Sequence, residues 1–354
     1  MLILPSKGGI FARIFQIPAR RVQCYYDPKE SPSVTMTISP KADAEKIEWP
    51  TILMLVATYL LWGFGTWIWS ISGPFSIFLT GLLITQHSSL QHEVLHGHPF
   101  RSVRLNEALV FPALSLIMPY GRFRDTHLQH HFDPALTDPY DDPESNFLDP
   151  AVWSTLSRPV QALLRANNTL LGRMILGPAS MAVLWIRSEV RSIRQGVPGV
   201  ALSWGLNVLG LIPVLGWLGW VGMPLWAYAI SVYFGMSVLR IRTFLEHRAH
   251  DAFRARTVIV EGRGPLALLF LNNNLHAVHH MHPKVSWYRL PALYAAHKDH
   301  YQRRNGGYVY RNYSQIFASY FLKAKDPVPH PIWPVRKSEP ADKSRAHAPV
   351  TTEV

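Results

Sequence analysis

Histidine is the residue type whose spacing in this chain could do chemistry. The chain has 17 histidines in 354 residues, and eight of them fall into three short groups. A His-x-x-x-His pair is followed by two copies of the spacing His-x-x-His-His, a combination that chance placement does not readily give. The groups are His92 and His96; His127, His130 and His131; and His276, His279 and His280.

This spacing predicts a metal centre. Residues three or four positions apart lie on one face of a helix, so we expect His92 and His96 to chelate one ion and the imidazoles of each later group to converge. A zinc site takes about four ligands, so eight imidazoles divide naturally between two ions. Nitrogen-rich sites suit Fe, Zn, Cu or Ni. Two redox-active ions at a bilayer would be suited to activating O2 against an inert C–H bond.

Two long uncharged tracts must position these groups. Residues 51–86 and 195–239 contain no Asp, Glu, Lys or Arg. A spanning helix needs about 20 apolar residues, so each tract has room for two spans. Turn residues at Gly73-Pro74 and Gly222-Met223-Pro224 predict helical hairpins near 51–70 and 74–91, and near 202–220 and 224–242. Buried helices of a soluble core are the alternative, which uncharged runs of this length disfavour.

The distribution of positive charge predicts the orientation. Lysines and arginines flank both hairpins, and the hairpin turns contain none. By the positive-inside rule, both termini and the histidine groups face the cytoplasm, in a multi-pass protein that we expect in a bacterial inner membrane. The net charge of +12 suits an anionic leaflet and an acidic electron donor. No basic stripe with interleaved aromatic residues lies outside the juxtamembrane zones, so we expect no nucleic-acid partner.

The remaining sequence suggests an all-α membrane domain over residues 49–322. Residues 1–48 are expected to be a poorly ordered segment, and residues 323–354, rich in Pro, Lys and Ser, a disordered tail. Spaced arginines over Trp153–Trp185 predict interfacial helices. The acidic, Pro-broken loop Asp133–Glu144 fits a functional role and a plain surface role equally well. The single cysteine, Cys24, excludes a disulfide framework and a thiolate metal cluster.

The three groups, with the sequences His92-Glu93-Val94-Leu95-His96, His127-Leu128-Gln129-His130-His131 and His276-Ala277-Val278-His279-His280, resemble the histidine boxes of membrane fatty-acid desaturases and their hydroxylase and ketolase relatives. The resemblance covers about residues 50–300. It implies four spanning helices, a di-iron centre, and O2-dependent removal of two hydrogens from a lipid or acyl substrate. It also implies a ninth nitrogen ligand just after the fourth span, where His247 stands.

The resemblance also bears on the groups around the irons. A ligating histidine usually donates its other N–H to a carboxylate or carbonyl group, and we expect Glu93 and Glu246 in that supporting role. In some relatives an Asn near the third box approaches an iron through water, and Asn272, Asn273 and Asn274 are all available. The chain has too few cysteines for a ferredoxin or rubredoxin domain, so electrons are expected from a separate ferredoxin- or rubredoxin-like protein. We expect His98, His250 and His282 to lie outside the ligand set.

Two other functions compete with this interpretation. His92-Glu93-x-x-His96 is also the helix motif of zinc proteases, with Glu93 as general base, but a protease would leave six boxed histidines without a role. A metal transporter or sensor would place its ligands within the spans, whereas these lie just beyond the span ends. Within the oxidase class, desaturation and hydroxylation differ by the position of the substrate, which the sequence leaves open.

Overall fold

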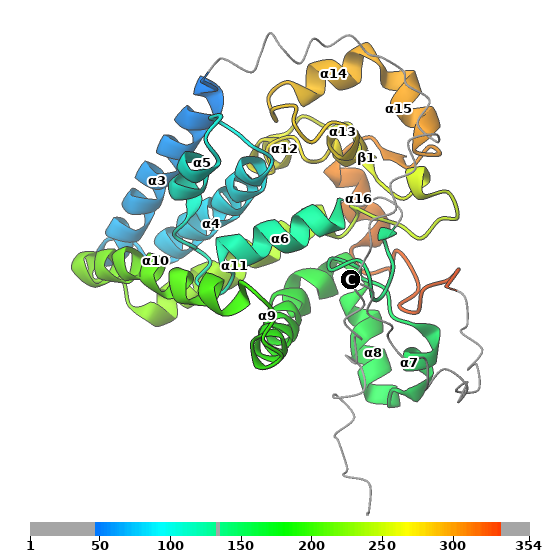
Figure 1. Ribbon diagram of the computed structural model, residues 1–354, viewed down its shortest axis with the longest axis horizontal. Coiled ribbons are helices and arrows are strands. Elements are labelled where there is room, and N and C mark those ends of the chain that lie inside the picture. The colour runs from blue at the N-terminus through cyan, green and yellow to red at the C-terminus, as the bar shows by residue number, and fades with distance from the viewer. Residues whose placement is uncertain (1–46, 132–134, 334–354) are drawn as a thin grey trace, which may run out of the picture.

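The computed structural model describes residues 47–131 and 135–333, and helices make up most of this part (Figure 1). The expectations for residues 1–46 and 334–354 lie outside the described residues. The all-α prediction holds apart from one short parallel sheet. The elements are α3 (Trp49–Trp67), η2 (Ile68–Ser70), α4 (Gly73–Leu95), α5 (Val103–Val110), α6 (Tyr120–His130), α7 (Pro150–Thr155), α8 (Arg158–Asn167), α9 (Leu170–Arg194), α10 (Val200–Val221), α11 (Leu225–Thr243), η4 (Phe253–Ala255), β1 (Ile259–Val260), α12 (Pro265–Leu269), α13 (His276–Met281), α14 (Leu290–Ala296), α15 (Lys298–Arg304), β2 (Val309–Tyr310) and α16 (Tyr313–Tyr320).

The four predicted helices exist as two consecutive pairs. In the first pair α3 packs along α4 as a hairpin, whereas α11 packs mainly against α4 and α9 rather than against α10. In the first, η2 joins α3 to α4, and α4 begins at Gly73 with a proline in its first turn, where the missing N–H costs nothing. In the second, α10 ends at Val221 and is capped by Gly222, whose φ of 72° lies in the left-handed region that glycine adopts without strain. The predicted helices and their turn residues are therefore present, and their assignment as four spans stays a prediction.

Three helices in the described part are long and apolar enough to cross a membrane: Trp49–Ser70, Leu170–Arg194 and Val200–Val221. Two of them are among the four predicted spans, whereas α4 and α11 do not meet the same criterion. The third, α9, falls largely in the stretch predicted to lie along the interface. Its charged residues stand near its two ends and leave residues 174–186 uncharged, which the prediction overlooked.

The helices α4 and α11 approach each other at a pair of glycines. A Cβ atom on Gly235 would lie 2.5 Å from the carbonyl oxygen of Gly81, so neither position has room for a side chain. The Thr85 hydroxyl donates to the Gly235 carbonyl at 2.8 Å. Most of α4 between residues 83 and 95 is buried. Because protein surrounds this half of α4, it carries polar side chains that would be costly against lipid.

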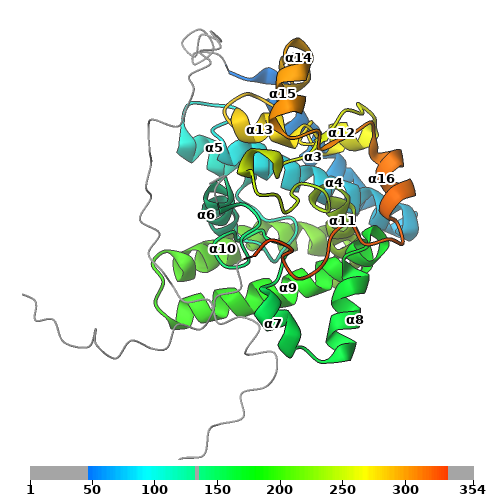
Figure 2. The same cartoon turned by 90° about the vertical axis from the view of Figure 1, so that its right-hand side faces the viewer.

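A separate cluster of apolar residues fixes the third histidine group. β1 pairs in parallel with β2, with Ile259 opposite Val309. Ile259, Val278 and Leu290 are buried together, which packs α13 against the strand. In both views, α14 and α15 lie at the opposite end of the molecule from α7 and α8 (Figures 1 and 2). The metal-ligand candidates of α13 are thus held by a small core of their own.

The structure describes the first residues of the segment predicted to be a disordered tail, 323–333. Several of their backbone groups bond to distant segments. The Lys325 amide donates to the Asn168 carbonyl at 3.3 Å, and the His330 amide donates to the Leu148 carbonyl at 2.8 Å. The Pro-rich composition favoured disorder, but bonds to Leu148 and Asn168 hold part of this backbone. The other expected boundary, at residue 48, stays a prediction.

Candidate metal centre

All nine histidines predicted as ligands lie together in the structure, delivered by four segments. The C-terminal ends of α4 and α6 each present side chains there, as does the short helix α13. The fourth segment follows α11, where a bridge between His247 and Thr257 fixes the backbone. The contributions are His92 and His96 from α4, His127, His130 and His131 from α6, His247, and His276, His279 and His280 from α13.

The ring nitrogens form two adjacent groups, in each of which the possible ligand atoms lie within 4.8 Å of one another. The rings of His131 and His280, one from each group, stack with their centroids 4.2 Å apart. The five-histidine group consists of His92, His96, His127, His131 and His279, and the four-histidine group consists of His130, His247, His276 and His280.

Each His-x-x-His-His group is divided between the two clusters, which corrects the expectation that its three imidazoles converge. His127 and His131, four positions apart, enter the five-histidine group, while His130 enters the other. The division is reversed on α13, where His276 and His280 enter the four-histidine group and His279 does not. On an α-helix the side chains of residues three positions apart point in directions about 60° apart. This angle is enough to aim their rings at different points.

The Nδ1 atoms of three histidines bond to acceptors outside the groups. His127 Nδ1 lies 2.8 Å from a Glu144 oxygen, and His130 Nδ1 lies 2.8 Å from Asp142 Oδ1. His276 Nδ1 lies 2.9 Å from the Asn273 side-chain oxygen. Such partners fix the orientation and the tautomer of a ligating imidazole. Sequence reasoning missed Asp142 and Glu144; their signal was the acidic loop directly after the second histidine group.

The positions of the Nε2 atoms fit a bound cation. Since carboxylates only accept hydrogen bonds, the proton of a neutral His130 belongs on Nδ1, which leaves a bare lone pair on Nε2; the same holds for His276 beside Asn273. Both Nε2 atoms face that of His247, at 2.9 Å and 3.2 Å. These facing nitrogens need either an added proton, as on a charged His130, or a shared cation between them. The nitrogen-rich donor set suits iron and other transition metals.

Electrostatics keeps most of these rings neutral, as metal ligands must be. Burial lowers the pKa of His131, His276 and His279 well below its usual value, and neighbouring histidines lower it further. His130 differs. Burial lowers its pKa, but the carboxylates of Glu144 and Asp142 more than offset this and raise it to about 9. Without a metal, a proton would therefore occupy His130, where a cation could replace it.

The two carboxylates expected to support the ligands differ in position. Glu246 acts through Asn273, whose side-chain nitrogen lies 3.4 Å from Glu246 Oε1 while its oxygen accepts from His276. Glu93 does not support a boxed histidine in this way. It accepts the backbone N–H of Trp287 at 2.8 Å and lies 3.8 Å from His98 Nε2. Of the three asparagines, Asn273 is the one that contacts a predicted ligand.

The remaining candidate histidines lie outside both groups, as expected. His98 Nδ1 bonds to Glu48 at 2.8 Å, at the start of α3. His250 is exposed, and its ring accepts the Ala252 backbone N–H. His282 packs edge-on against Tyr301.

The fold and the site together define a class of protein: a helical membrane protein with two adjoining histidine clusters. The family model for fatty acid desaturases matches residues 67–312, which include every boxed histidine. The chain belongs to the fatty acid desaturase family, a family of oxidoreductases that typically carry a di-iron centre. No curated protein matches the chain.

Proposed function

We propose that this protein is an O2-dependent desaturase of an acyl or alkyl chain, with two irons bound by the nine clustered histidines. The observation that carries the proposal is the division of these histidines into adjoining groups of five and four. The family match supports the reaction class. Hydroxylation or ketolation by the same centre is the alternative within the superfamily.

The chain's own residues would hold and orient the metal ligands. Irons bound by the histidines would supply the oxidising power for hydrogen abstraction from an unactivated C–H bond. Asp142, Glu144 and Asn273 would hold His130, His127 and His276 as Nδ1 tautomers, with Nε2 aimed at the metal. Burial of the cluster would exclude water from the reacting chain and favour neutral imidazoles.

The setting is a membrane with the four predicted spans, α3, α4, α10 and α11, and the histidine clusters on the cytoplasmic side. We place α9 along the interface, because its uncharged residues 174–186 fall short of the roughly 20 that a span needs. Flanking arginines and lysines support this orientation. Both α4 and α11 run toward the clusters, so buried polar residues near their C-terminal ends are compatible with spanning. Electrons would come from a separate ferredoxin- or rubredoxin-like protein, for which the basic charge of the chain is suited.

The position of Glu93 counts against the zinc-protease alternative. A general base must reach the water on the metal, within hydrogen-bond distance. The Glu93 carboxylate instead accepts from the backbone of Trp287 and lies beside His98. The protease motif at His92 and His96 therefore lacks its base, and the other seven clustered histidines support an oxidase.

The proposal is tested by expressing the chain and extracting lipids and polar metabolites. We expect a product lighter by two hydrogens that depends on O2 and disappears in His279→Ala, while His250→Ala, at an exposed position, keeps it. A product heavier by one oxygen would favour the hydroxylase. Full activity of His279→Ala would remove the site assignment.

A further inference from the structure

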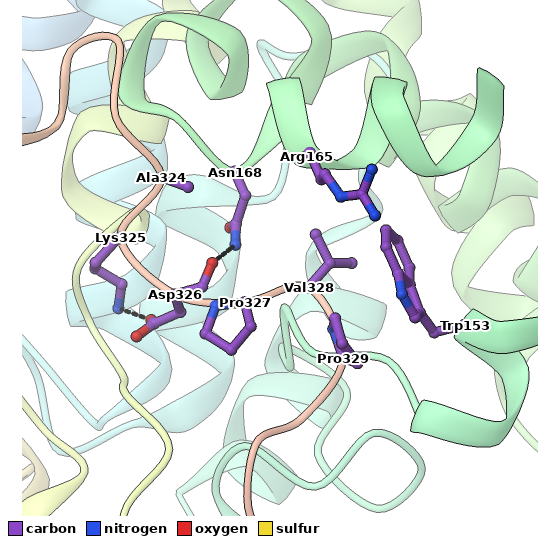
Figure 3. Close-up of a pocket in the computed structure, with 9 residues that line it drawn as sticks. All are labelled: Trp153, Arg165, Asn168, Ala324, Lys325, Asp326, Pro327, Val328 and Pro329. Atoms are coloured by element: carbon purple, nitrogen blue, oxygen red, sulfur yellow. Dashed lines mark hydrogen bonds and ion pairs between the residues drawn. The ribbon is translucent and has the colours of Figure 1, made fainter. Parts of the chain in front are cut away.

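The C-terminal segment Lys325–His330, here called the strap, crosses the molecule between a surface cavity and the four-histidine group. Leu148 holds it from one side, donating from its amide to the Val328 carbonyl at 2.9 Å. The Asn168 side chain donates to the Asp326 carbonyl (Figure 3). On its outer side lies a cavity of about 540 Å³ bounded by Trp153 and Arg165. The strap is therefore one wall of a cavity and is anchored to distant segments.

The first contact from the strap to the cluster is made by Lys325. Its Nζ atom donates to the backbone carbonyl of His247 at 2.6 Å, and also contacts the Tyr308 hydroxyl and Asp326. The Lys325 side chain is only 8% exposed, and burial lowers its pKa, so the ammonium depends on these partners. Within the described residues, His247 Nδ1 has no hydrogen-bond partner. The ring of His247 is thus positioned through its backbone, which the bridge to Thr257 and the Lys325 ammonium hold together.

The second contact starts from His330. Its Nε2 atom lies 3.2 Å from the Thr137 hydroxyl. The Thr137 amide donates to Asp142 Oδ2 at 2.9 Å, and Asp142 Oδ1 bonds to His130 Nδ1. Thr137 has a φ of 69°, which is strained for a β-branched residue and persists only when surrounding contacts enforce it. The strap thus reaches a second ligand of the same group through Thr137 and Asp142.

We propose that the strap is a positioning element for one metal of the pair, the one bound by the four-histidine group. This inference rests on the proposed function. Lys325 and His330 act on His247 and His130, which face each other across 2.9 Å. Among the described residues, the strap makes no direct hydrogen bond to the five-histidine group. The route from His330 comes near that group only one step further on, since Asp142 Oδ1 also accepts the Glu144 N–H and Glu144 bonds to His127. The Lys325 contact is therefore the more selective of the two. Loss of either contact is therefore expected to affect the two metals unequally.

The test uses full-length protein, purified with ⁵⁷Fe, and three substitutions in the strap. Lys325→Met removes the bond to His247, and His330→Phe removes the bond to Thr137. Lys325→Arg keeps a cation that can donate and is expected to rescue. Lys323→Met, two positions before at an exposed site, is the matched control. Loss of a partner behind a ligand typically weakens metal binding by roughly 10- to 100-fold.

We expect Lys325→Met and His330→Phe to hold half the iron of the wild type, with one of the two Mössbauer environments lost and the other unchanged. Equal loss of both irons would indicate a general structural role and overturn the inference, as would full retention of both. Failure of the proposed function looks different: the wild type itself would then bind no iron pair.

Discussion

The Nε2 atoms of His130 and His247 lie 2.9 Å apart, although 117 positions separate the two residues in the chain. One stands in the last turn of α6, the other just beyond α11. His130 is held by Asp142, while the His247 backbone is held by Lys325. This pair therefore joins three parts of the chain, the α6 end, the α11 exit and the C-terminal segment, at one proposed metal.

Removal of a ligand from either group is expected to abolish the reaction. In His130→Ala the four-histidine group keeps three rings, and in His279→Ala the five-histidine group keeps four. We expect His130→Ala to lose one iron and all product while the protein still inserts into the membrane. Iron analysis of the membrane-extracted protein, with exposed His250→Ala as the control, checks this. Two irons in His130→Ala would refute its assignment as a ligand.

Two carboxylates bond to ligating histidines, and the loss of either charge is expected to weaken iron binding rather than abolish it. Asp142→Asn and Glu144→Gln keep the shape of the side chain but weaken the acceptor for His130 and His127. We expect iron binding to weaken by roughly 10- to 100-fold in each. Competition with a chelator measures this. Asp141→Asn, at an exposed neighbouring position, should bind iron as the wild type does; equal weakening there would point to a general effect of loop charge.

Acidification is expected to destabilise the metal-free protein. The pKa of His131, His276 and His279 is lowered in the fold, so below the unfolded value of about 6.5 the unfolded chain binds more protons. Each such histidine removes about 1.4 kcal/mol of stability per pH unit below that value. His130 opposes this, since its raised pKa of about 9 contributes stability below pH 6.5 that is lost as the pH rises through 9.

The pKa of His96 and of His247 is lowered as well, while His130, His98 and Glu93 have a raised pKa. With these five lowered against three raised values, the net effect on stability has the sign of the lowered group. Thermal unfolding of iron-free protein between pH 7.5 and 5.5 should show a falling Tm. A Tm that is constant or rises over this range would contradict the burial of neutral imidazoles.

Because α4 and α11 touch at two glycines, we expect a larger side chain at Gly235 to destabilise the protein strongly. A side chain at Gly235 would meet the carbonyl oxygen of Gly81, so Gly235→Val must push the helices apart. We expect a loss of about 1–3 kcal/mol, the usual cost of overpacking, or more. The midpoint of thermal unfolding in detergent measures it. Gly219→Ala on α10, where a Cβ meets nothing within 4 Å, should leave the midpoint unchanged or slightly raised.

The sequence predicted the ligands better than their arrangement. The spacing at His127 and at His276 was sufficient to identify each group, and family resemblance supplied His247. The helical repeat places the residues four apart in one cluster and the remaining histidine in the other. Which cluster each enters depends on how α6 and α13 face each other, and no local pattern carries that information. Asp142 reaches His130 through the turn at Thr137, whose left-handed backbone is a tertiary effect.

The membrane spans, too, could be predicted from the sequence only in part. Uncharged tracts located α3 and α10, because lipid-facing helices must be apolar along their length. α4 carries Gln86, His87 and Gln91 in a buried half, so composition understates its suitability for the membrane interior. The strap was missed for a related reason: a Pro-rich segment has no periodic pattern, and its order comes from Leu148 and Asn168.

The central claim is that nine histidines hold two irons, and the most direct test is the metal content of the purified wild-type chain. The account predicts two irons per chain, divided between two nitrogen-ligated environments in the Mössbauer spectrum. One zinc per chain, or no iron after expression in iron-supplemented medium, would contradict it.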